Sequence, residues 1–208
     1  MAFTGFADSD FAAFHIEGLE ARMDAIRTRI QPKFIELGDS LCDDVAMAAG
    51  SEMFVHIAKH LRRKINPPKD TWMAFAGSKR GYKQHPHFQI GLFDDHVFLW
   101  FALIYELPEK KKIAADFIKN IDTVRQTIPS GYAISFDHMK KDALKAGDLS
   151  KAELRKALER FRDVQKVELL VGRHLLADDP VLKDGSAFIG LAKETFETLM
   201  PLYRLSLN

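Results

Sequence analysis

HFQIGLFDDHVFLWFALIY, residues 87–105, decides the fold. Its two apolar runs flank a tight polar segment at 94–96, which is typical of a hairpin turn. In the first run every second residue from 88 to 92 is a large apolar one, the pattern of a strand with one apolar face. The second run, 97–105, is apolar throughout, which indicates a strand buried on both faces. The stretch therefore predicts an antiparallel hairpin whose second strand is an inner strand of a sheet. Six side chains are expected to be largely buried in the core of the sheet: Trp72, Phe88, Ile90, Leu99, Phe101 and Leu103.

Further strands are predicted on both sides of this hairpin. Residues 53–62 alternate as a strand would, although their apolar positions also suit a helix. We favour a strand that pairs with 71–76 in an antiparallel hairpin, because NPPKD at 66–70 is rich in turn residues. The segments GYAISF, 131–136, and KVELLVG, 166–172, have the composition of additional strands.

Helices are predicted toward both ends of the chain and between the strands. Residues 8–49 have helical spacing of apolar residues, with Pro32 in the first turn of a new helix and Gly50 as its end. Residues 109–126 form another such stretch, and 150–161 begins with a capping box of Ser150 and Glu153. A last amphipathic helix is predicted over 185–200, and Pro201 is expected to kink or end it.

The order of these elements predicts the fold class. Strands joined mostly by hairpins, with helices at both ends, favour an α+β fold over a doubly wound parallel sheet. We expect an antiparallel sheet of about five to six strands, with helices from both termini packed on it. The chain of 208 residues is expected to form a single domain, 1–208, with N-terminal helices at 8–49, a sheet core at 53–136 and a C-terminal helix-strand-helix at 150–208.

Composition restricts the location and the chemistry. The N-terminus lacks a basic segment followed by a long apolar core, so it does not resemble a signal peptide. The longest apolar run, 97–105, is too short for a membrane-spanning helix, which needs about 20 residues. A single cysteine, Cys42, excludes an internal disulfide and any Cys-x-x-Cys motif. We therefore expect a cytoplasmic protein with no membrane partner.

Charge is distributed unevenly along the chain. Residues 56–87 contain eight Lys or Arg and one acid, a net charge of +7, while the remaining 22 basic and 28 acidic residues give −6. Four of the eight histidines lie in the same segment. If folding brings these residues together, they form a focused positive surface.

The segment predicts a site for an anion. His56, His60 and Arg62 share one face of the predicted strand, because even spacing places side chains on the same side. His87 and Gln89 lie on the face opposite the apolar residues of their strand. The loop at 79–83 would form the rim, with Gly81 allowing close backbone approach. A phosphate-bearing ligand, either a nucleotide or a nucleic acid, fits the arginine and lysine donors and an aromatic ring for stacking. The candidate binding residues are His56, His60, Arg62, Lys79, Arg80, Tyr82, Lys83, His87 and Gln89.

The anion hypothesis makes one geometric prediction. Arg80 and Lys83 should approach His60 or His87 closely enough to share an anion. Replacement of Arg80 should then weaken polyanion binding. The alternative is that the positive residues form only a solvated loop.

Two other functions remain open from the residues. An enzyme could use His56, His60 or His87 as acid, base or ligand, because histidine titrates near neutral pH. Zinc could bind to His56 and His60 together with His85 or His87, but the cationic surroundings oppose a divalent cation, so we predict no metal. A structural or partner-binding protein without a small ligand is the remaining alternative.

Phosphate-loop, dinucleotide-binding and nucleophile-elbow motifs do not occur, so no cofactor is predicted.

A family resemblance is carried by two long stretches. HIAKHLRRKINPPKDTWMAFAGSKRGYKQHPHFQIGLF, followed by HVFLWFALIYE, resembles the YktB-like bacterial proteins, and DFAAFHIEGLEARMDAIRTRIQPKFIELG resembles their N-terminus. The resemblance implies a compact α+β cytosolic protein of about this length. It implies no reaction, cofactor or catalytic residue.

Overall fold

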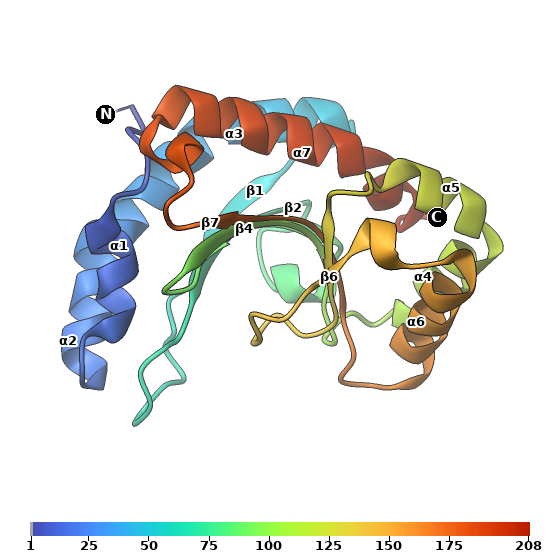
Figure 1. Cartoon of the computed structure of the whole chain (residues 1–208), viewed down its shortest axis with the longest axis horizontal. Helices are drawn as coiled ribbons and strands as arrows, with labels where there is room; N and C mark the ends of the chain where they lie inside the picture. Colours follow the sequence, from blue (N-terminus) through green and yellow to red (C-terminus); the bar gives the residue numbers. More distant parts are fainter. Residues whose placement is uncertain (1) are drawn as a thin grey trace.

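The computed structural model describes residues 2–208. Within them, seven strands form one antiparallel sheet in the order β1-β2-β3-β4-β7-β5-β6 (Figure 1). The predicted α+β fold with an antiparallel sheet is confirmed. The strand number slightly exceeds the predicted five to six, because β6 has only two residues and shows no alternation to recognise. The strands are β1 Phe54–Ile57, β2 Thr71–Ala76, β3 His87–Leu92, β4 His96–Leu103, β5 Ala133–Ser135, β6 Leu144–Lys145 and β7 Leu169–Leu176.

The central hairpin forms as predicted. In its register Phe88 lies opposite Phe101 and Ile90 lies opposite Leu99. Strand β4 has β3 on one side and β7 on the other, so it is an inner strand. All six side chains predicted to be buried are buried, and Trp72, with 7% of its surface exposed, is the most accessible of them.

Strand β1 settles the ambiguous segment. It pairs with β2 in an antiparallel hairpin, with His56 opposite Ala74. The predicted strand is confirmed for Phe54–Ile57 and wrong for residues 58–62, which leave the sheet. The physical reason is local: His60 has a left-handed backbone, with φ of +51°, which breaks the extended conformation.

The N-terminal helices are α1 Asp8–Ala12, α2 Leu19–Ala25 and α3 Gln31–Ala49. A π-helical turn, Ile26–Ile30, joins α2 to α3. Pro32 lies in the first turn of α3, where its missing N–H leaves no intrahelical hydrogen bond unmade. Gly50 ends the helix in the left-handed region, with φ of +71°. Both predicted helix signals are therefore confirmed.

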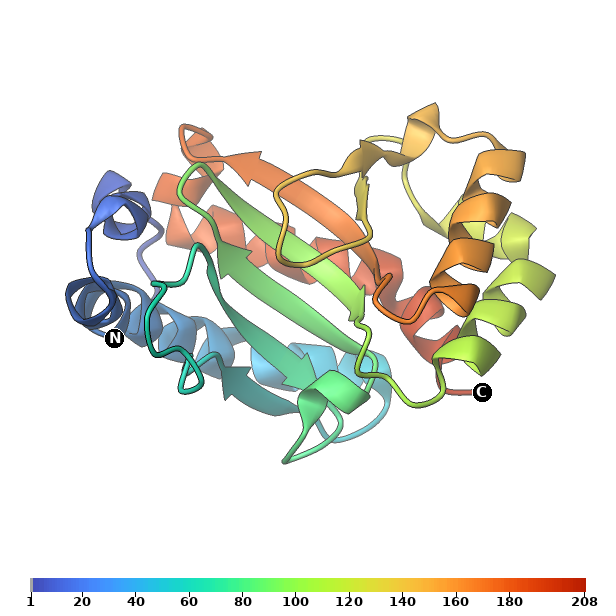
Figure 2. The same ribbon diagram turned by 90° about the horizontal axis from the view of Figure 1, so that it is seen from below.

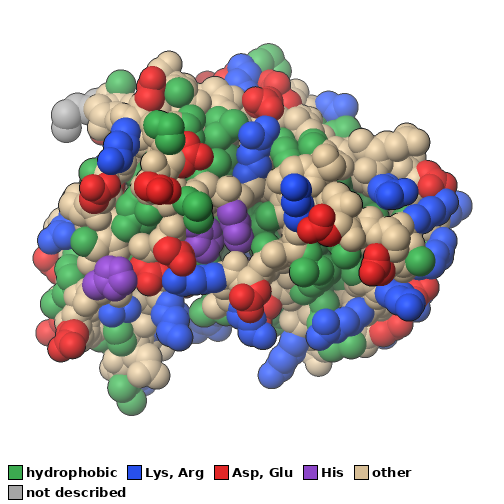
Figure 3. Space-filling model, in the orientation of Figure 1, with side chains coloured by type: hydrophobic (Ala, Val, Ile, Leu, Met, Phe, Trp, Pro, Cys, Tyr) green, Lys and Arg blue, Asp and Glu red, His purple; other side chains and the backbone are tan. Residues whose placement is uncertain are grey.

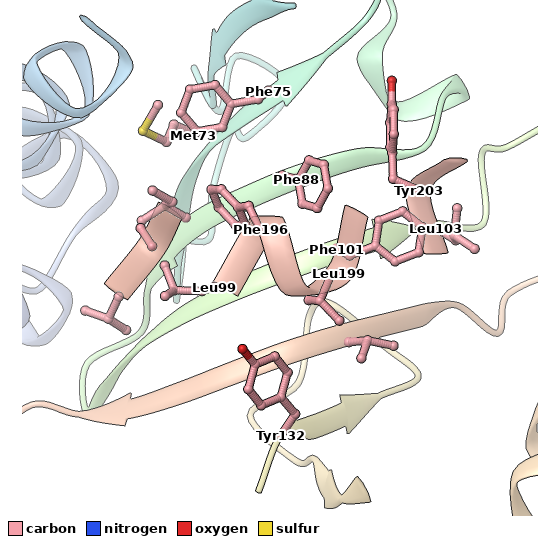
Figure 4. Packing of buried hydrophobic residues seen from close by; sticks show 14 of the residues in the cluster. Met73, Phe75, Phe88, Leu99, Phe101, Leu103, Tyr132, Phe196, Leu199 and Tyr203 are labelled. Carbon is pink, nitrogen blue, oxygen red and sulfur yellow. The ribbon is translucent and has the colours of Figure 1, made fainter. Parts of the chain in front are cut away.

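The long C-terminal helix α7, Gly185–Leu205, packs beside α3 on one face of the sheet (Figure 1). Aromatic rings join this helix to the central strands (Figure 4): the ring centroid of Phe88 lies 4.9 Å from that of Phe196 and 5.4 Å from that of Tyr203. Of the two alternatives predicted for Pro201, a kink or an end of the helix, the second is wrong, because α7 continues to Leu205. Burial of Leu202 and Tyr203 stabilises the turn that follows the proline.

Three further helices lie at the opposite end of the sheet from α1 and α2 (Figure 1). They are α4 Lys110–Lys119, α5 Ile121–Thr127 and α6 Lys151–Asp163. The capping box of α6 is confirmed: Ser150 Oγ accepts from the Glu153 amide, and the Ser150 amide donates to the Glu153 carboxylate at 2.8 Å. The helices at both ends give the molecule the shape of an arch, with the sheet beneath α3 and α7.

The sheet face turned away from α3 and α7 is called the underside here (Figure 2). It carries a second apolar cluster that includes Trp72, Trp100 and Leu170. Loops rather than long helices border it (Figure 2), among them those that contain residues 58–63, 82–83 and 138–139. A surface covered only by loops leaves room for a cavity.

Gly172 tests the tight packing of the inner strands. A Cβ atom at this position would lie 1.8 Å from the backbone oxygen of Leu99. We expect Gly172→Ala to lower the free energy of unfolding by about 1–3 kcal/mol, because β4 and β7 must separate. Gly190→Ala in α7 is the matched control, since its Cβ would meet nothing within 4 Å, and it should stabilise by up to about 1 kcal/mol. Urea unfolding measures both; equal midpoints for the two variants would contradict the prediction.

Candidate functional site

A cavity of about 600 Å³ opens on the underside. Its walls include residues 57–63 at the end of β1 and beyond it, Trp72 on β2, the turn at 82–83, and the loop that follows β5. Tyr105, just beyond β4, contributes an exposed aromatic ring to the wall. The cavity is called the Trp72 pocket below.

Trp72 organises the pocket through its indole ring. Its Nε1–H donates to the Tyr82 hydroxyl at 2.7 Å. The Lys83 ammonium lies 5.3 Å from the centroid of the same ring and 3.7 Å from a carboxylate oxygen of Glu106. A lysine between an aromatic face and a carboxylate is held in place, yet keeps donors for an additional anion.

Tyr82 links the predicted histidines to the tryptophan. Its ring stacks on His56 at 4.8 Å between centroids and meets the edge of His87 at 5.2 Å. Burial raises the pKa of Tyr82 to about 12, so the hydroxyl keeps its proton at neutral pH. Gly81, with φ of +65°, allows the chain to turn into this position.

His60 is held in an unfavourable backbone conformation. Within residues 2–208 it is the only non-glycine residue with positive φ. Its Nε2 is hydrogen-bonded to Thr71 Oγ1 at 3.1 Å, and its ring meets Trp72 edge to face at 5.6 Å. Burial lowers the pKa of His60 to about 4, and the positive charges of Arg63 and Lys83 contribute. Strain of this kind persists where the surrounding structure enforces it, which is common at functional sites.

His138 and Glu168 form a pair that the sequence analysis missed. Glu168 is only 1% exposed, and its carboxylate accepts from both the backbone N–H and Nδ1 of His138, at 2.7 Å each. The Tyr105 amide donates to the same carboxylate at 3.3 Å. Only the placement of β5 beside β7 brings these residues together. The one feature of the sequence that could have indicated this pair is Glu168 itself, a single acid inside the apolar strand segment KVELLVG.

Asp70 is a second buried carboxylate near the pocket. It is 1% exposed, and neither side-chain oxygen accepts a hydrogen bond from another residue within 2–208. Burial raises its pKa to about 6, although the charges of His138, Arg63 and Lys83 act in the opposite direction. An unpaired buried carboxylate reduces stability, so its presence here suggests that the site needs it.

His87 and Gln89 lie beneath the pocket rather than in it. They are 0% and 2% exposed, and the Gln89 amide donates to His87 Nε2 at 2.8 Å. His87 Nδ1–H donates to the backbone oxygen of His85, and burial lowers the pKa of His87 to about 3. These two candidates are on the predicted face, but a ligand on the surface does not reach them. The His87 ring supports that of Tyr82, and Gln89 holds His87 in place.

The other predicted residues divide into two groups. Arg62 lines the Trp72 pocket together with Lys83, His60 and Tyr82. Lys79 lies apart from it, with its ammonium 5.1 Å from the centroid of the Phe54 ring on β1. Arg80 is exposed and does not line the pocket. Of the two residues expected to share an anion with His60 or His87, only Lys83 lines the pocket together with His60. The turn at Gly81 lies between Arg80 and Lys83.

The alternative zinc site at the predicted histidines does not assemble. His56 Nε2 is bound to the Ser78 backbone oxygen at 2.8 Å, and His87 is buried with both ring nitrogens occupied. In the described part of the chain, three metal-ligand atoms come close together only at Asp137, His138 and Glu168. The 2.7 Å separation of His138 Nδ1 and Glu168 is that of a direct hydrogen bond, which fits a histidine–carboxylate pair rather than two ligands around an ion.

Lysine and arginine side chains lie along the lower part of the molecule, interspersed with acidic ones (Figure 3). The pocket itself is lined by Lys59, Arg62, Arg63 and Lys83, and no carboxylate lines it. Four of the eight basic residues in the 56–87 segment therefore line one cavity. Among residues 2–208, no helix combines the length and the apolar composition required to cross a membrane.

Comparison with other proteins gives a family without an assigned activity. A family model described as a domain of unknown function (DUF1054) matches residues 6–203. A UPF0637 protein of Oceanobacillus iheyensis is 52% identical over 204 residues, covering 98% of this chain and 97% of the relative. A UPF0637 protein of Shouchella clausii is 53% identical over 208 residues, covering 100% and 97%. One of Listeria monocytogenes is 48% identical over the full length of both chains. The predicted family resemblance is confirmed.

Proposed function

Because the chain belongs to the DUF1054 family, a family of unknown function, its activity has to be inferred from the site, and we propose that the Trp72 pocket binds an anionic, phosphate-bearing ligand. The observation that carries the proposal is Lys83, fixed between the Trp72 ring and Glu106 at the wall of the cavity. Arg62 and Arg63 line the same cavity and supply guanidinium donors, which match phosphate oxygens.

The aromatic residues favour a nucleotide or a nucleic acid over a simple anion. Tyr105 is 42% exposed at the pocket wall and offers a face on which a base can stack. A cavity of about 600 Å³ has the size of typical small-molecule sites. No comparable observation favours a purely structural role.

Replacement of Lys83 tests the proposal. We expect Lys83→Ala to weaken binding of a fluorescent oligonucleotide by about 1–3 kcal/mol, the contribution of a charge-assisted contact. Lys83→Arg should retain most of the affinity, because it keeps the charge. The affinity should fall as salt rises, with a smaller slope for Lys83→Ala. Fluorescence titration at two salt concentrations, repeated with ADP and pyrophosphate, gives the measurement.

Arg80→Ala is the matched control. The sequence predicts that Arg80 contacts the anion, but its side chain is exposed and lies outside the pocket. Its removal should therefore leave the affinity nearly unchanged. Wild-type protein that binds none of these probes, or an Arg80→Ala variant as weak as Lys83→Ala, would rule out the Trp72 pocket as the binding site.

A further inference from the structure

Two imidazole rings flank Trp72 in the pocket. His60 comes from the segment after β1, and His138 comes from the loop after β5. Their centroids lie 5.6 Å and 5.8 Å from the Trp72 ring, and both meet it edge to face. Both histidines line the cavity that contains Lys83.

The two histidines have opposite surroundings. His60 faces the cations Arg63 and Lys83, which favour the neutral ring. When its Nε2–H donates to Thr71 Oγ1, Nδ1 carries the lone pair and can accept a proton. One ring of the pair is therefore suited to the role of base.

His138 is suited to the role of acid. It donates Nδ1–H to the buried carboxylate of Glu168, which fixes the orientation of the ring. Its Nε2 makes no hydrogen bond with any residue in 2–208, so a proton there is available to a ligand. This is how a carboxylate positions a histidine for proton transfer.

The lining of the pocket restricts the reaction class. It contains no serine, threonine or cysteine, so the protein offers no hydroxyl or thiol nucleophile of that kind. It also contains no carboxylate of the type that Mg²⁺ prefers in phosphoryl-transfer sites. A substrate that carries its own nucleophile fits such a lining. A ribonucleic acid strand supplies one, because each 2′-hydroxyl lies next to a phosphodiester.

We propose that the Trp72 pocket cleaves single-stranded RNA, with His60 as the general base and His138 as the general acid. This inference rests on the proposed anion site. His60 Nδ1 takes the proton of the 2′-hydroxyl while O2′ forms a bond to phosphorus. The bond from phosphorus to O5′ breaks, and His138 Nε2 gives its proton to O5′.

The products of this step are a 2′,3′-cyclic phosphate and a 5′-hydroxyl end. Proton exchange with solvent then returns His60 and His138 to their starting forms. Lys83 stabilises the negative charge that develops on the non-bridging oxygens. Lys59, Arg62 and Arg63 at the pocket wall contact neighbouring phosphates, and Tyr105 stacks on a base.

The test uses the full chain and a set of three oligonucleotides of one sequence: RNA, DNA and 2′-O-methyl RNA, each with a fluorophore and a quencher. We expect binding of all three but cleavage of the RNA alone, since only RNA has a free 2′-hydroxyl. Cleavage should persist with a chelator present, and mass spectrometry should find the cyclic phosphate.

Conservative variants separate catalysis from folding. Asparagine tolerates the left-handed backbone of position 60, and at position 138 it still offers an amide donor to Glu168. His60→Asn and His138→Asn should each lower the RNA cleavage rate by about 100-fold or more, the usual contribution of a general acid or base. Their affinity for the DNA strand should fall far less than the rate of RNA cleavage does.

Glu168 is a positioning residue, and its test is the pH profile. His138 faces Glu168 and Asp137, with the buried Asp70 also in range. Glu168→Gln should move the alkaline limb of the rate profile to lower pH, because the imidazolium loses its carboxylate partner. The acid limb, set by His60, should stay in place, and Glu168→Asp should restore part of the rate.

The outcomes distinguish this inference from the proposed function. DNA and RNA that bind while RNA remains intact would overturn the cleavage reaction and leave the anion site standing. Failure to bind any strand would overturn both. RNA cleavage at equal rates by wild type, His60→Asn and His138→Asn would mean that the activity belongs to a contaminant, and the inference fails.

Discussion

Phe101→Ala is expected to lower the free energy of unfolding by about 3–5 kcal/mol. Phe101 lies at the middle of β4 and is 0% exposed, with the Phe88 ring 5.8 Å away and the Tyr203 ring 6.5 Å away. Removal of the ring takes apolar contacts from the sheet and from α7 at once and leaves a cavity between them. Urea denaturation of wild type and variant, with a shared m-value, measures the loss.

Leu176→Ala is the control for Phe101→Ala. It lies at the end of the adjacent strand β7 and is 65% exposed, so its replacement should change stability by less than about 1 kcal/mol. A Phe101→Ala variant as stable as Leu176→Ala would show that the centre of the sheet is not the core of the molecule.

Asp70→Asn is expected to stabilise the protein at pH 7, by up to about 3 kcal/mol. The pKa of Asp70 in the folded protein is raised from 3.8 to about 6, so the folded state binds its proton more tightly than the unfolded state does. Stability therefore falls as the pH rises from about 4 to about 6, and the full penalty applies above that window. Asparagine has a similar shape and carries no charge to bury.

The test of Asp70 is the pH dependence of unfolding. Urea midpoints between pH 4 and pH 8 should show a growing advantage of Asp70→Asn over wild type, with little difference at pH 4. Asp24→Asn, on the exposed surface of α2, should follow wild type throughout. A loss of stability in Asp70→Asn at pH 7 would mean that the carboxylate has a partner in the folded protein. Stability gained together with weaker oligonucleotide binding would link the carboxylate to the site.

Local patterns were informative where the backbone follows a regular period. The alternation before 93 and the unbroken apolar run after 96 predicted β3 and β4 correctly. The same reasoning was extended past Ile57 to align His56, His60 and Arg62, and there it was wrong. His60 turns left-handed, so period-2 spacing no longer describes the chain. His60 and Arg62 still reach the pocket, but the fold of the 58–63 segment brings them there.

The sequence by itself determined the fold class, the inner strand, the start of a helix at Pro32, its end at Gly50, and the positive segment. Each of these depends on neighbouring residues, through backbone propensity, periodicity or charge. Only the tertiary structure decided which of the charged residues share a site. It placed Lys83 over Trp72 and left Arg80 outside, through one turn at Gly81. It also paired His138 with Glu168, 30 residues apart, by setting β5 beside β7. Such pairings depend on strand order and on the burial of a carboxylate, and no local period encodes either.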